Sequence, residues 1–422
     1  MSGRKIMAVA AAALLVWAGA GRPQPAPATV DAVTYWNRIA TDATVAVEMD
    51  PLAESRLFAI LHLAIHDALN AIDRRYETYA AAVPAGAGAT AEAAVAAAAH
   101  AVLTELFPAA KPTFDAAYAE ALRPLRNDEA KKRGLSVGSK AAAAMLALRR
   151  NDGASRTVER AAGTQPGEYR PTPPDYTPAK FAQWPGITPF VLKSAAQFRP
   201  APPPVVDSEV ALADIAEVKA IGAQVSPTRS EEQSEIARFW YENSTQGWNR
   251  ISREIAMSRK LSLWESARFF ALVNLAMADG FIGGFEAKYH YYYWRPATAI
   301  RAAGDSTWES YLWTPPVPDY PSTHTVLGAA AATVMARFCE TDFVSFQSAS
   351  GVPYPGLTRK FWSFSEAARE NGASRVLAGI HFTSAVNAGY VQGEQIGAWV
   401  FAHALRPVRT APSRAGATTS LQ

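Results

Sequence analysis

One helix pattern near the N-terminus constrains the fold more than any other feature of the chain. Asp50 is a suitable N-cap, and Pro51 follows in the first helical turn, where its missing N–H is tolerated. The apolar residues that come next recur with a period of about 3.6 residues: Leu57, Phe58, Leu61, Ile65, Ala68, Leu69 and Ile72. A helix with such a stripe has to pack it against other elements, so the pattern predicts a helix inside a helical core.

Helical patterns of the same kind recur along most of the chain. They predict helices over residues 30–46, 91–107, 113–126, 128–150, 206–222, 229–243, 246–258, 261–286, 324–338, 358–371 and 383–404. We find no convincing strand and no internal repeat of fixed period. The predicted fold class is therefore all-α, built as a helical bundle.

Composition divides the chain into segments. Arg4 and Lys5 precede an uncharged, alanine-rich run over residues 6–21, which is typical of a signal peptide and predicts a periplasmic or secreted protein. An uncleaved N-terminal anchor is the alternative. The predicted organisation is a signal peptide (1–28), an N-terminal helical region (29–150), a proline-rich connecting segment that crosses the surface (151–205), a C-terminal helical region (206–405) and a tail (406–422).

Charge and cysteine content exclude several kinds of partner and site. The net charge of +3 over 422 residues gives no indication of nucleic acid as a partner. The single cysteine, Cys339, excludes an intrachain disulfide and a thiol-ligated metal site. The longest apolar stretch after the signal, 269–285, contains Asp279, so we expect no membrane span once the signal is removed. The sequence is compatible with a homo-oligomer.

Three short groups in the last third of the chain gather side chains suited to a tetrahedral oxyanion. The first contains Lys288 and Arg295, which lie seven residues apart, or about two helical turns. We therefore expect both side chains to leave one face of a helix and to clamp the same anion. Pro296 disfavours helix at Arg295 and is expected to end the helix there.

The second group is Pro321-Ser322-Thr323-His324, directly before an apolar helical pattern. Ser322 or Thr323 is the expected N-cap of that helix. A helix start presents free backbone N–H groups and the positive end of the dipole to a bound anion. The sequence therefore predicts that His324, in the first turn, lies beside such an anion.

The third group is Ser374-Arg375, followed by His381 six residues after Arg375. Ser374 is a suitable cap for a short helix that begins at Arg375. On an ideal helix His381 would lie about 120° away from Arg375, so one residue could clamp the anion while the other attacks or ligates it.

Together these groups resemble the vanadium-dependent haloperoxidases and the acid phosphatases that share their site within the type 2 phosphatidic acid phosphatase superfamily. The family pattern is Lys, six residues, Arg-Pro; then Pro-Ser-Gly-His; then Ser-Arg, five residues, His. The chain meets all three in order, with Thr323 in place of the glycine. Ala278-Asp279, Trp294 and the segment 379–382 also look like the bacterial haloperoxidase-like branch.

The resemblance implies a role for each matching residue. The oxygens of vanadate would be held by Lys288, Arg295, Ser322, Thr323 and Arg375. His381 would be the ligand of the vanadium, or the nucleophile that forms a phosphohistidine in a phosphatase. His324 would be the general acid and base. The fold implied is the helical bundle of this family.

Three further positions depart from the family pattern. Many members carry an aspartate four residues after the last histidine, where this chain has Ala385, so the group that orients His381 must come from elsewhere. Val317 stands where halide-oxidising members often have an aromatic residue or a histidine, and Phe285 where some chloride-oxidising members have tryptophan. The resemblance therefore supports chloride oxidation less than it supports the anion site.

Two enzyme classes fit these residues. The leading hypothesis is a haloperoxidase with vanadate as cofactor and with hydrogen peroxide and halide as substrates. The alternative is an exported acid phosphatase that needs no cofactor and acts on a phosphate ester through His381 and His324. A helical protein that only binds anions is a third interpretation, which two reactive histidines disfavour.

Other motifs have structural interpretations beside functional ones. His62 and His66, four residues apart on one predicted helix, have the spacing of metal ligands, but a core position is preferred. The aromatic run 289–294 is interpreted as rings that pack the core and line the rim rather than a dedicated binding platform. Three glycines spaced four apart predict close approach of another helix: Gly389, Gly393 and Gly397.

Overall fold

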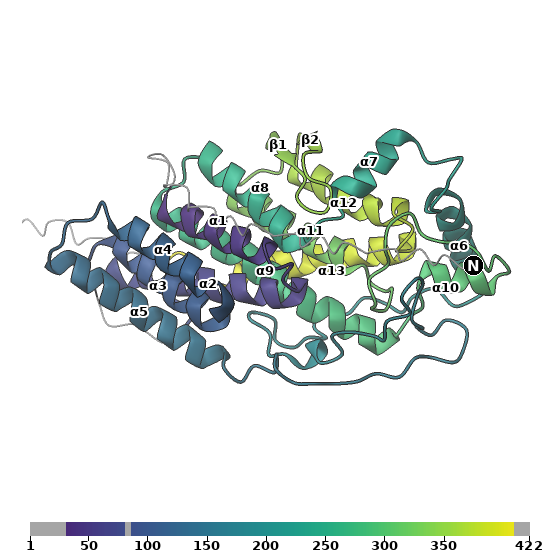
Figure 1. The fold of residues 1–422 in the computed structure, drawn as a ribbon, viewed down its shortest axis with the longest axis horizontal. Coiled ribbons are helices and arrows are strands. Elements are labelled where there is room, and N and C mark those ends of the chain that lie inside the picture. The colour runs from purple at the N-terminus through teal and green to yellow at the C-terminus, as the bar shows by residue number, and fades with distance from the viewer. Residues whose placement is uncertain (1–30, 81–85, 409–422) are drawn as a thin grey trace, which may run out of the picture.

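The computed structural model describes residues 31–80 and 86–408, and within these ranges the molecule is built almost entirely from helices (Figure 1). The predicted signal peptide and the predicted tail from residue 409 onward lie outside the described residues. The helices are α1 (Ala32–Val45), α2 (Pro51–Ile72), α3 (Ala91–Leu106), α4 (Lys111–Leu122), α5 (Glu129–Arg149), α6 (Glu209–Ile221), α7 (Glu231–Phe239), α8 (Ser244–Ser258), α9 (Leu263–Tyr291), α10 (Pro296–Ala302), α11 (Thr323–Phe338), α12 (Phe364–Leu377) and α13 (Thr383–His403). The predicted all-α class is confirmed.

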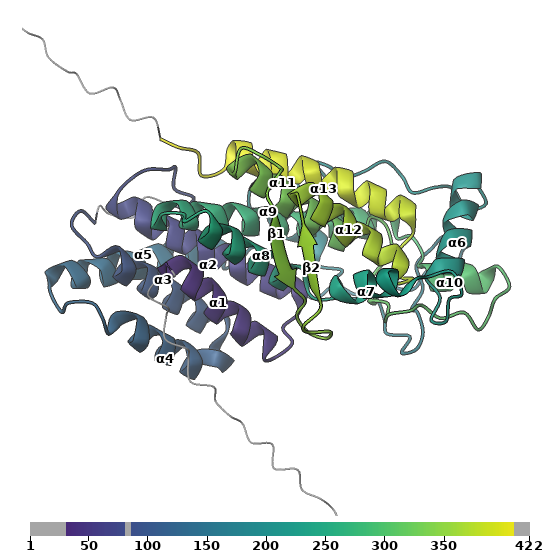
Figure 2. The same ribbon diagram turned by 90° about the horizontal axis from the view of Figure 1, so that it is seen from above.

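Helix α9 is the central element of the molecule. It packs against α2 from the N-terminal half and against α11 and α13 from the C-terminal half. Figure 2 shows α1–α5 gathered at one end of the molecule and α6, α7 and α10 at the other. Among the described residues, α9 is long and apolar enough to resemble a membrane span, and α3 with α4 does so only as a bent pair. In α9 94% of the most apolar window is buried against other helices, as expected of a core helix.

The start of α2 follows the sequence prediction. The Asp50 carboxylate accepts hydrogen bonds from the backbone N–H groups of Leu52 and Ala53, and Pro51 is the first helical residue. The predicted apolar stripe is buried except for Ile72, which is partly exposed. The local cap and the periodicity were therefore sufficient to predict this helix.

Three glycines let α13 approach α11 closely, as predicted. A Cβ atom at Gly389 would lie 2.5 Å from the carbonyl oxygen of Ser322, and one at Gly397 would lie 2.6 Å from that of Ala330. The third, Gly393, faces Val326 in the same way. This contact holds α13 against the N-terminal turn of α11, which carries the second sequence group.

The proline-rich segment 151–205 runs along the molecule beside α9 and α10 (Figure 1). Asp279 is fully buried in α9 and accepts hydrogen bonds from three consecutive backbone N–H groups at 190–192. Further along, hydroxyl groups of the aromatic run donate to carbonyl oxygens of the segment: Tyr289 to Lys180, Tyr291 to Pro200, Tyr292 to Ala161 and Tyr293 to Pro204. The aromatic run therefore fastens the segment to the helical body.

The expectation of no strand is wrong in one place. Strands β1 (Phe346–Ala349) and β2 (Thr358–Phe361) form an antiparallel hairpin, so the helix predicted over 358–371 instead begins at Phe364. Each strand has only four residues, which is too few for an alternating pattern to be recognised. The paired rings of Phe346 and Phe361, with centroids 5.4 Å apart, fix the hairpin to the core.

Candidate active site

The first sequence group does not lie on one helix, contrary to the expectation. Helix α9 ends at Tyr291, and Tyr292 takes a left-handed conformation with φ 50°. The chain then turns, Tyr293 pairs with Glu168, and Arg295 becomes the N-cap of α10. The prediction that helical spacing places Lys288 and Arg295 on one face is therefore wrong.

Lys288 and Arg295 nevertheless converge on the same loop, residues 315–319. The Nζ atom of Lys288 donates to the carbonyl oxygens of Pro318 (2.5 Å) and Asp319 (2.9 Å). The Nε atom of Arg295 donates to the carbonyl oxygen of Val317 at 2.7 Å. Both side chains are almost completely buried, so these carbonyl groups hold two cations close together away from solvent.

In the second group Ser322 is the N-cap of α11. The sequence had predicted either Ser322 or Thr323 at this position. The backbone N–H of Ser322 donates to the carbonyl oxygen of Ala385 at 2.9 Å, and its hydroxyl accepts from Thr325 at 2.9 Å. Thr323, the departure from the family glycine, fits because a Cβ atom on Gly284 of α9 would lie only 2.6 Å from its Cγ2 atom. The absence of that Cβ makes room for the threonine.

His324 lies in the first turn of α11 and is partly buried. Its Nδ1 atom is 2.7 Å from the Oγ atom of Ser244, the first residue of α8. Its Nε2 atom is buried and has no hydrogen-bond partner among the described residues. One ring nitrogen is thus engaged by the protein and the other is available to a ligand.

The third group lies at the end of a helix, which contradicts the predicted cap. Ser374 and Arg375 are in the last turn of α12, and the real cap of that helix is Ser363, which accepts from the backbone N–H of Glu366 at 3.0 Å. The sequence placed the helix start at a later serine because Ser363 follows the unrecognised hairpin. His381 lies in the loop between α12 and α13, so no helical geometry relates it to Arg375.

Asp319 is the group that lies beside His381, in place of the missing family aspartate. Its Oδ1 atom is 2.8 Å from Nδ1 of His381 and 3.7 Å from Nη1 of Arg295. The same Nη1 atom is 3.0 Å from Nε2 of His381. The expectation that the orienting group comes from elsewhere than position 385 is therefore satisfied by a buried aspartate from the loop before the second group.

A cavity of about 320 Å³ joins the three groups. Its charged and polar lining includes Arg295, Thr323, His324, Arg375 and His381. Lys288 and Ser322 lie behind this wall and are fully buried. The remaining walls are largely apolar and come from both halves of the chain: Pro51, Leu52, Phe181, Phe281, Phe285, Trp313, Pro315, Pro316 and Val317.

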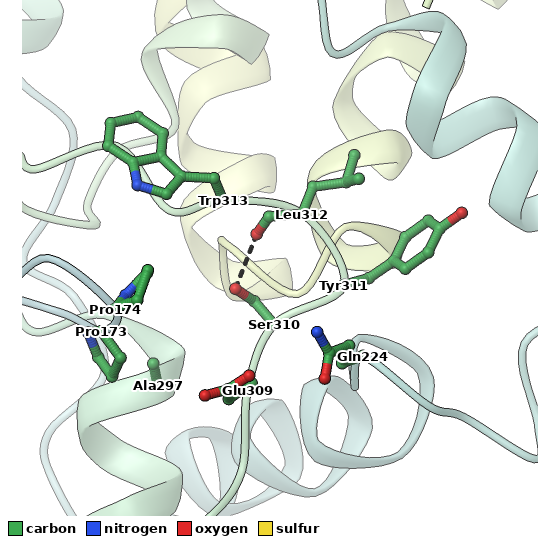
Figure 3. Close-up of a pocket in the computed structure, with 9 residues that line it drawn as sticks. All are labelled: Pro173, Pro174, Gln224, Ala297, Glu309, Ser310, Tyr311, Leu312 and Trp313. Carbon is green, nitrogen blue, oxygen red and sulfur yellow. Dashed lines mark hydrogen bonds between the residues drawn. The ribbon is translucent and has the colours of Figure 1, made fainter. Parts of the chain in front are cut away.

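A second cavity, of about 200 Å³, is lined by the loop that carries Trp313 (Figure 3). Trp313 lines both cavities. Among the described residues that line the smaller one there is no lysine, arginine or histidine, and Glu309 is its charged residue. Of these two cavities, the one of about 320 Å³ therefore has the side chains that can bind an anion.

Burial and mutual repulsion perturb the ionisable groups around the larger cavity. Burial, together with Arg295, lowers the pKa of Lys288 well below its usual value, and burial lowers the pKa of Arg375 to about 10. Burial first, and then the neighbouring cations, lowers the pKa of His381, so its imidazole is neutral at neutral pH. Burial and Arg375 act on the pKa of His324 in the same direction.

This arrangement suits an oxyanion. Three buried cations lie near the buried carboxylate of Asp319, whose pKa burial raises to about 7. A second buried carboxylate, that of Glu242, lines the cavity but is paired with Arg250. The Nε atom of Arg375 and Nε2 of His324 have no hydrogen-bond partner in the described part of the chain. Buried nitrogen atoms without partners are costly unless a ligand engages them. A tetrahedral oxyanion would engage them and offset the repulsion between the cations.

The sequence did not identify two residues that contact the histidines, Ser244 and Asp319. Asp319 is the single acidic residue in the stretch 310–339, which was an available signal. Ser244 had a weaker one, because Asn243 before it is a good N-cap and the helix prediction already broke at 244–245. Neither feature of the sequence predicts which histidine Ser244 or Asp319 would contact.

The other candidate metal ligands, His62 and His66, occupy the core. Nε2 of His62 is 2.9 Å from the side-chain nitrogen of Asn37, and its ring stacks on Phe270 with centroids 5.2 Å apart. Nδ1 of His66 is 3.1 Å from the Asp67 carboxylate. Among the described residues no group of three or more His, Cys, Asp or Glu side chains could hold a metal ion. The preferred core interpretation is confirmed.

Two family models match the chain. One, described as the vanadium chloroperoxidase N-terminal domain, matches residues 24–192, and the other, the VCPO second helical-bundle domain, matches residues 268–410. The curated vanadium chloroperoxidase of Curvularia inaequalis is 26% identical over 229 residues. That match spans 38% of this chain and 38% of the length of the relative.

Solved structures agree over most of the chain. A bacterial vanadium-dependent iodoperoxidase superposes with a TM-score of 0.83 at 26% identity, covering 92% of this chain and 100% of that one. A holo-type bacterial vanadium-dependent chloroperoxidase superposes with a TM-score of 0.69 at 20% identity, covering 85% and 93%. At the lower identity the likeness is one of fold.

Proposed function

Because the chain belongs to the vanadium-dependent haloperoxidase family, we propose that it binds vanadate and uses hydrogen peroxide to oxidise a halide. The observation that carries the proposal is the cavity that brings together Arg295, Arg375 and two neutral histidines, with Lys288 buried behind its wall. Buried nitrogen atoms of Arg375 and His324 have no partner among the described residues. Such preorganised charge is worth most where water is excluded. The motif residues supply all of it.

The residues present fit vanadate as an oxyanion. Lys288, Arg295 and Arg375 would hold its oxygens together with Ser322 and Thr323 at the start of α11, and His381 would be the ligand of the vanadium. Vanadate, when bound, supplies the centre at which hydrogen peroxide is activated for halide oxidation.

The protein contributes charge and proton handling. The cations offset negative charge that develops on the oxygens during the reaction. His324, kept neutral by burial and by Arg375, can accept a proton from entering hydrogen peroxide at Nε2 and return it to the departing oxygen. Apolar walls limit the water that could compete.

We propose iodide and bromide as substrates ahead of chloride. Val317 and Phe285, the two departures associated with halide oxidation, both line the cavity. Iodide is also the halide that is most easily oxidised, and the structure with a TM-score of 0.83 is that of an iodoperoxidase. Export to the periplasm or the medium, expected from residues 1–28, would give access to external halide.

A phosphatase remains the second candidate, because a neutral His381 beside Asp319 in a cationic cavity also suits attack on a phosphate ester. The test is to assay purified protein with and without orthovanadate for peroxide-dependent oxidation of iodide, bromide and chloride, and for hydrolysis of p-nitrophenyl phosphate. We expect vanadate-dependent iodide oxidation. Robust hydrolysis without any halide oxidation would instead establish the phosphatase, and His381→Ala should abolish whichever activity is found.

A further inference from the structure

The two ring nitrogens of His324 have different surroundings, and this difference extends the site beyond the three sequence groups. Nε2 is buried without a partner in a residue that lines the cavity. Nδ1 lies 2.7 Å from the Ser244 hydroxyl. The cavity that Nε2 faces is also lined by Arg295 and Arg375, whose guanidinium groups can only donate hydrogen bonds.

A hydroxyl oxygen can accept a hydrogen bond, so the Ser244 hydroxyl can satisfy a proton on Nδ1. In this tautomer Nε2 carries the lone pair and presents it to the cavity. The opposite tautomer would leave a buried N–H without an acceptor, in a cavity lined by two guanidinium groups. The surroundings of the ring therefore favour the form of His324 that can accept a proton at Nε2.

Ser244 is itself held by the N-terminal half of the molecule. Its neighbour Asn243 caps α8 by accepting from the backbone N–H of Thr245 at 3.0 Å. The side-chain nitrogen of Asn243 donates to the carboxylate of Glu54, a fully buried residue of α2. Glu54 also accepts from Gln246 at 3.1 Å and from the hydroxyl of Thr44. A buried carboxylate thus fixes the turn that places the Ser244 hydroxyl.

We propose that Ser244 is a positioning residue that sets the tautomer of His324, and that Glu54 of the N-terminal half holds it in register through Asn243. The importance of the tautomer for catalysis rests on the proposed function, because it matters only if Nε2 accepts a proton. The tautomer itself does not depend on that function.

The tautomer can be measured directly by 15N–1H correlation spectroscopy on full-length protein labelled at its 7 histidines, with inorganic phosphate as the probe anion. A His324→Gln sample identifies the signal. We expect wild-type His324 to show a protonated Nδ1 and a pyridine-like Nε2. Ser244→Ala should shift the population towards the other tautomer, and Ser244→Thr, which keeps the hydroxyl, should restore it.

The matched control is Ser208→Ala, which removes the capping serine of α6. Like Ser244→Ala, this substitution removes a serine hydroxyl at the start of a helix. It should nevertheless leave the His324 signal unchanged. A wild-type signal with the proton on Nε2, or a tautomer that Ser244→Ala does not move, would overturn the proposal.

Kinetics separate this proposal from the proposed function. With vanadate bound, Ser244→Ala should lower kcat for iodide oxidation about 10- to 100-fold, while the Kd for vanadate changes little. If wild-type protein oxidises no halide but the tautomer still depends on Ser244, the proposed function fails and the assignment of Ser244 stands. If halide oxidation is robust and the tautomer does not change in Ser244→Ala, the assignment of Ser244 fails and the proposed function stands.

Discussion

The two helical halves of this molecule contribute to one cavity by different physical means. The C-terminal half supplies the three cations and two histidines in or behind the cavity wall, which lie between Lys288 and His381 in the sequence. The N-terminal half supplies apolar wall, at Pro51 and Leu52, and the buried carboxylate of Glu54, 189 residues before the asparagine that it holds. The ionisable chemistry therefore resides in short motifs, whereas its alignment depends on contacts between distant segments.

The largest expected effect is on the pH dependence of stability, through the buried carboxyl group of Glu54. Burial raises the pKa of Glu54 to about 7, so the folded state binds this proton more tightly than the unfolded state does. Its contribution to stability is fully present below about pH 4.5 and is lost as pH rises towards 7, by about 3 kcal/mol in total. Thermal unfolding of wild type and Glu54→Gln from pH 5 to pH 8 should show the variant gaining stability relative to wild type as pH rises.

The control is Glu129→Gln, whose carboxylate is largely exposed in a surface pair with Lys132. Its difference from wild type should be nearly independent of pH. A Glu54→Gln profile parallel to that of wild type would show that Glu54 is not the proton-binding group, and would weaken the proposed link between the two halves.

The corresponding residue of the C-terminal half is Asp319. Because its carboxylate lies 2.8 Å from Nδ1 of His381, Asp319→Asn removes the charge that orients the ring. We expect vanadate affinity or kcat to fall about 10- to 100-fold. Titration calorimetry with orthovanadate and iodide-oxidation kinetics measure the two separately. Asp305→Asn, which removes the charge from a surface pair with Lys219, should change neither. An unaffected Asp319→Asn would leave His381 without an assigned orienting group.

The sequence predicted what is encoded locally. The cap at Asp50, the stripe of α2 and the glycines of α13 each act within one or two turns, and each has the predicted consequence. The three groups were also found, because each is a short pattern of charged and capping residues. Their meeting in one cavity followed from the family resemblance and not from helical spacing, since α9 ends before Arg295.

Long-range contacts were out of reach. The position of Asp319 beside His381 depends on how the loop 315–319 lies over Arg295, and that loop is fixed by carbonyl groups that every residue carries. The hairpin of β1 and β2 was missed because its strands are short, and this displaced the predicted start of α12. Ser244 could be seen as a helix start but not as the partner of His324.

A smaller effect tests the packing that supports the second group. Gly397→Ala would place a Cβ atom 2.6 Å from the carbonyl oxygen of Ala330, which forces α13 away from α11. We expect a loss of about 1–3 kcal/mol in the free energy of unfolding, measured by urea denaturation. At Gly186 the nearest atom to an added Cβ is 3.7 Å away, so Gly186→Ala is a control that should have little effect. Equal losses in both variants would show that helix contact is not the cause.

The smallest effect is expected where this chain leaves the family pattern. Thr323→Gly restores the family glycine, and the backbone N–H that we propose to contact the anion is present in both proteins. Vanadate affinity should therefore stay within about threefold of wild type, while the free energy of unfolding falls by about 1 kcal/mol because glycine loses more conformational freedom at the helix start. Calorimetric titration and urea denaturation test the two parts independently. A tenfold or larger change in affinity would mean that the threonine side chain itself contacts the anion, and the departure would then be functional rather than a matter of packing against Gly284.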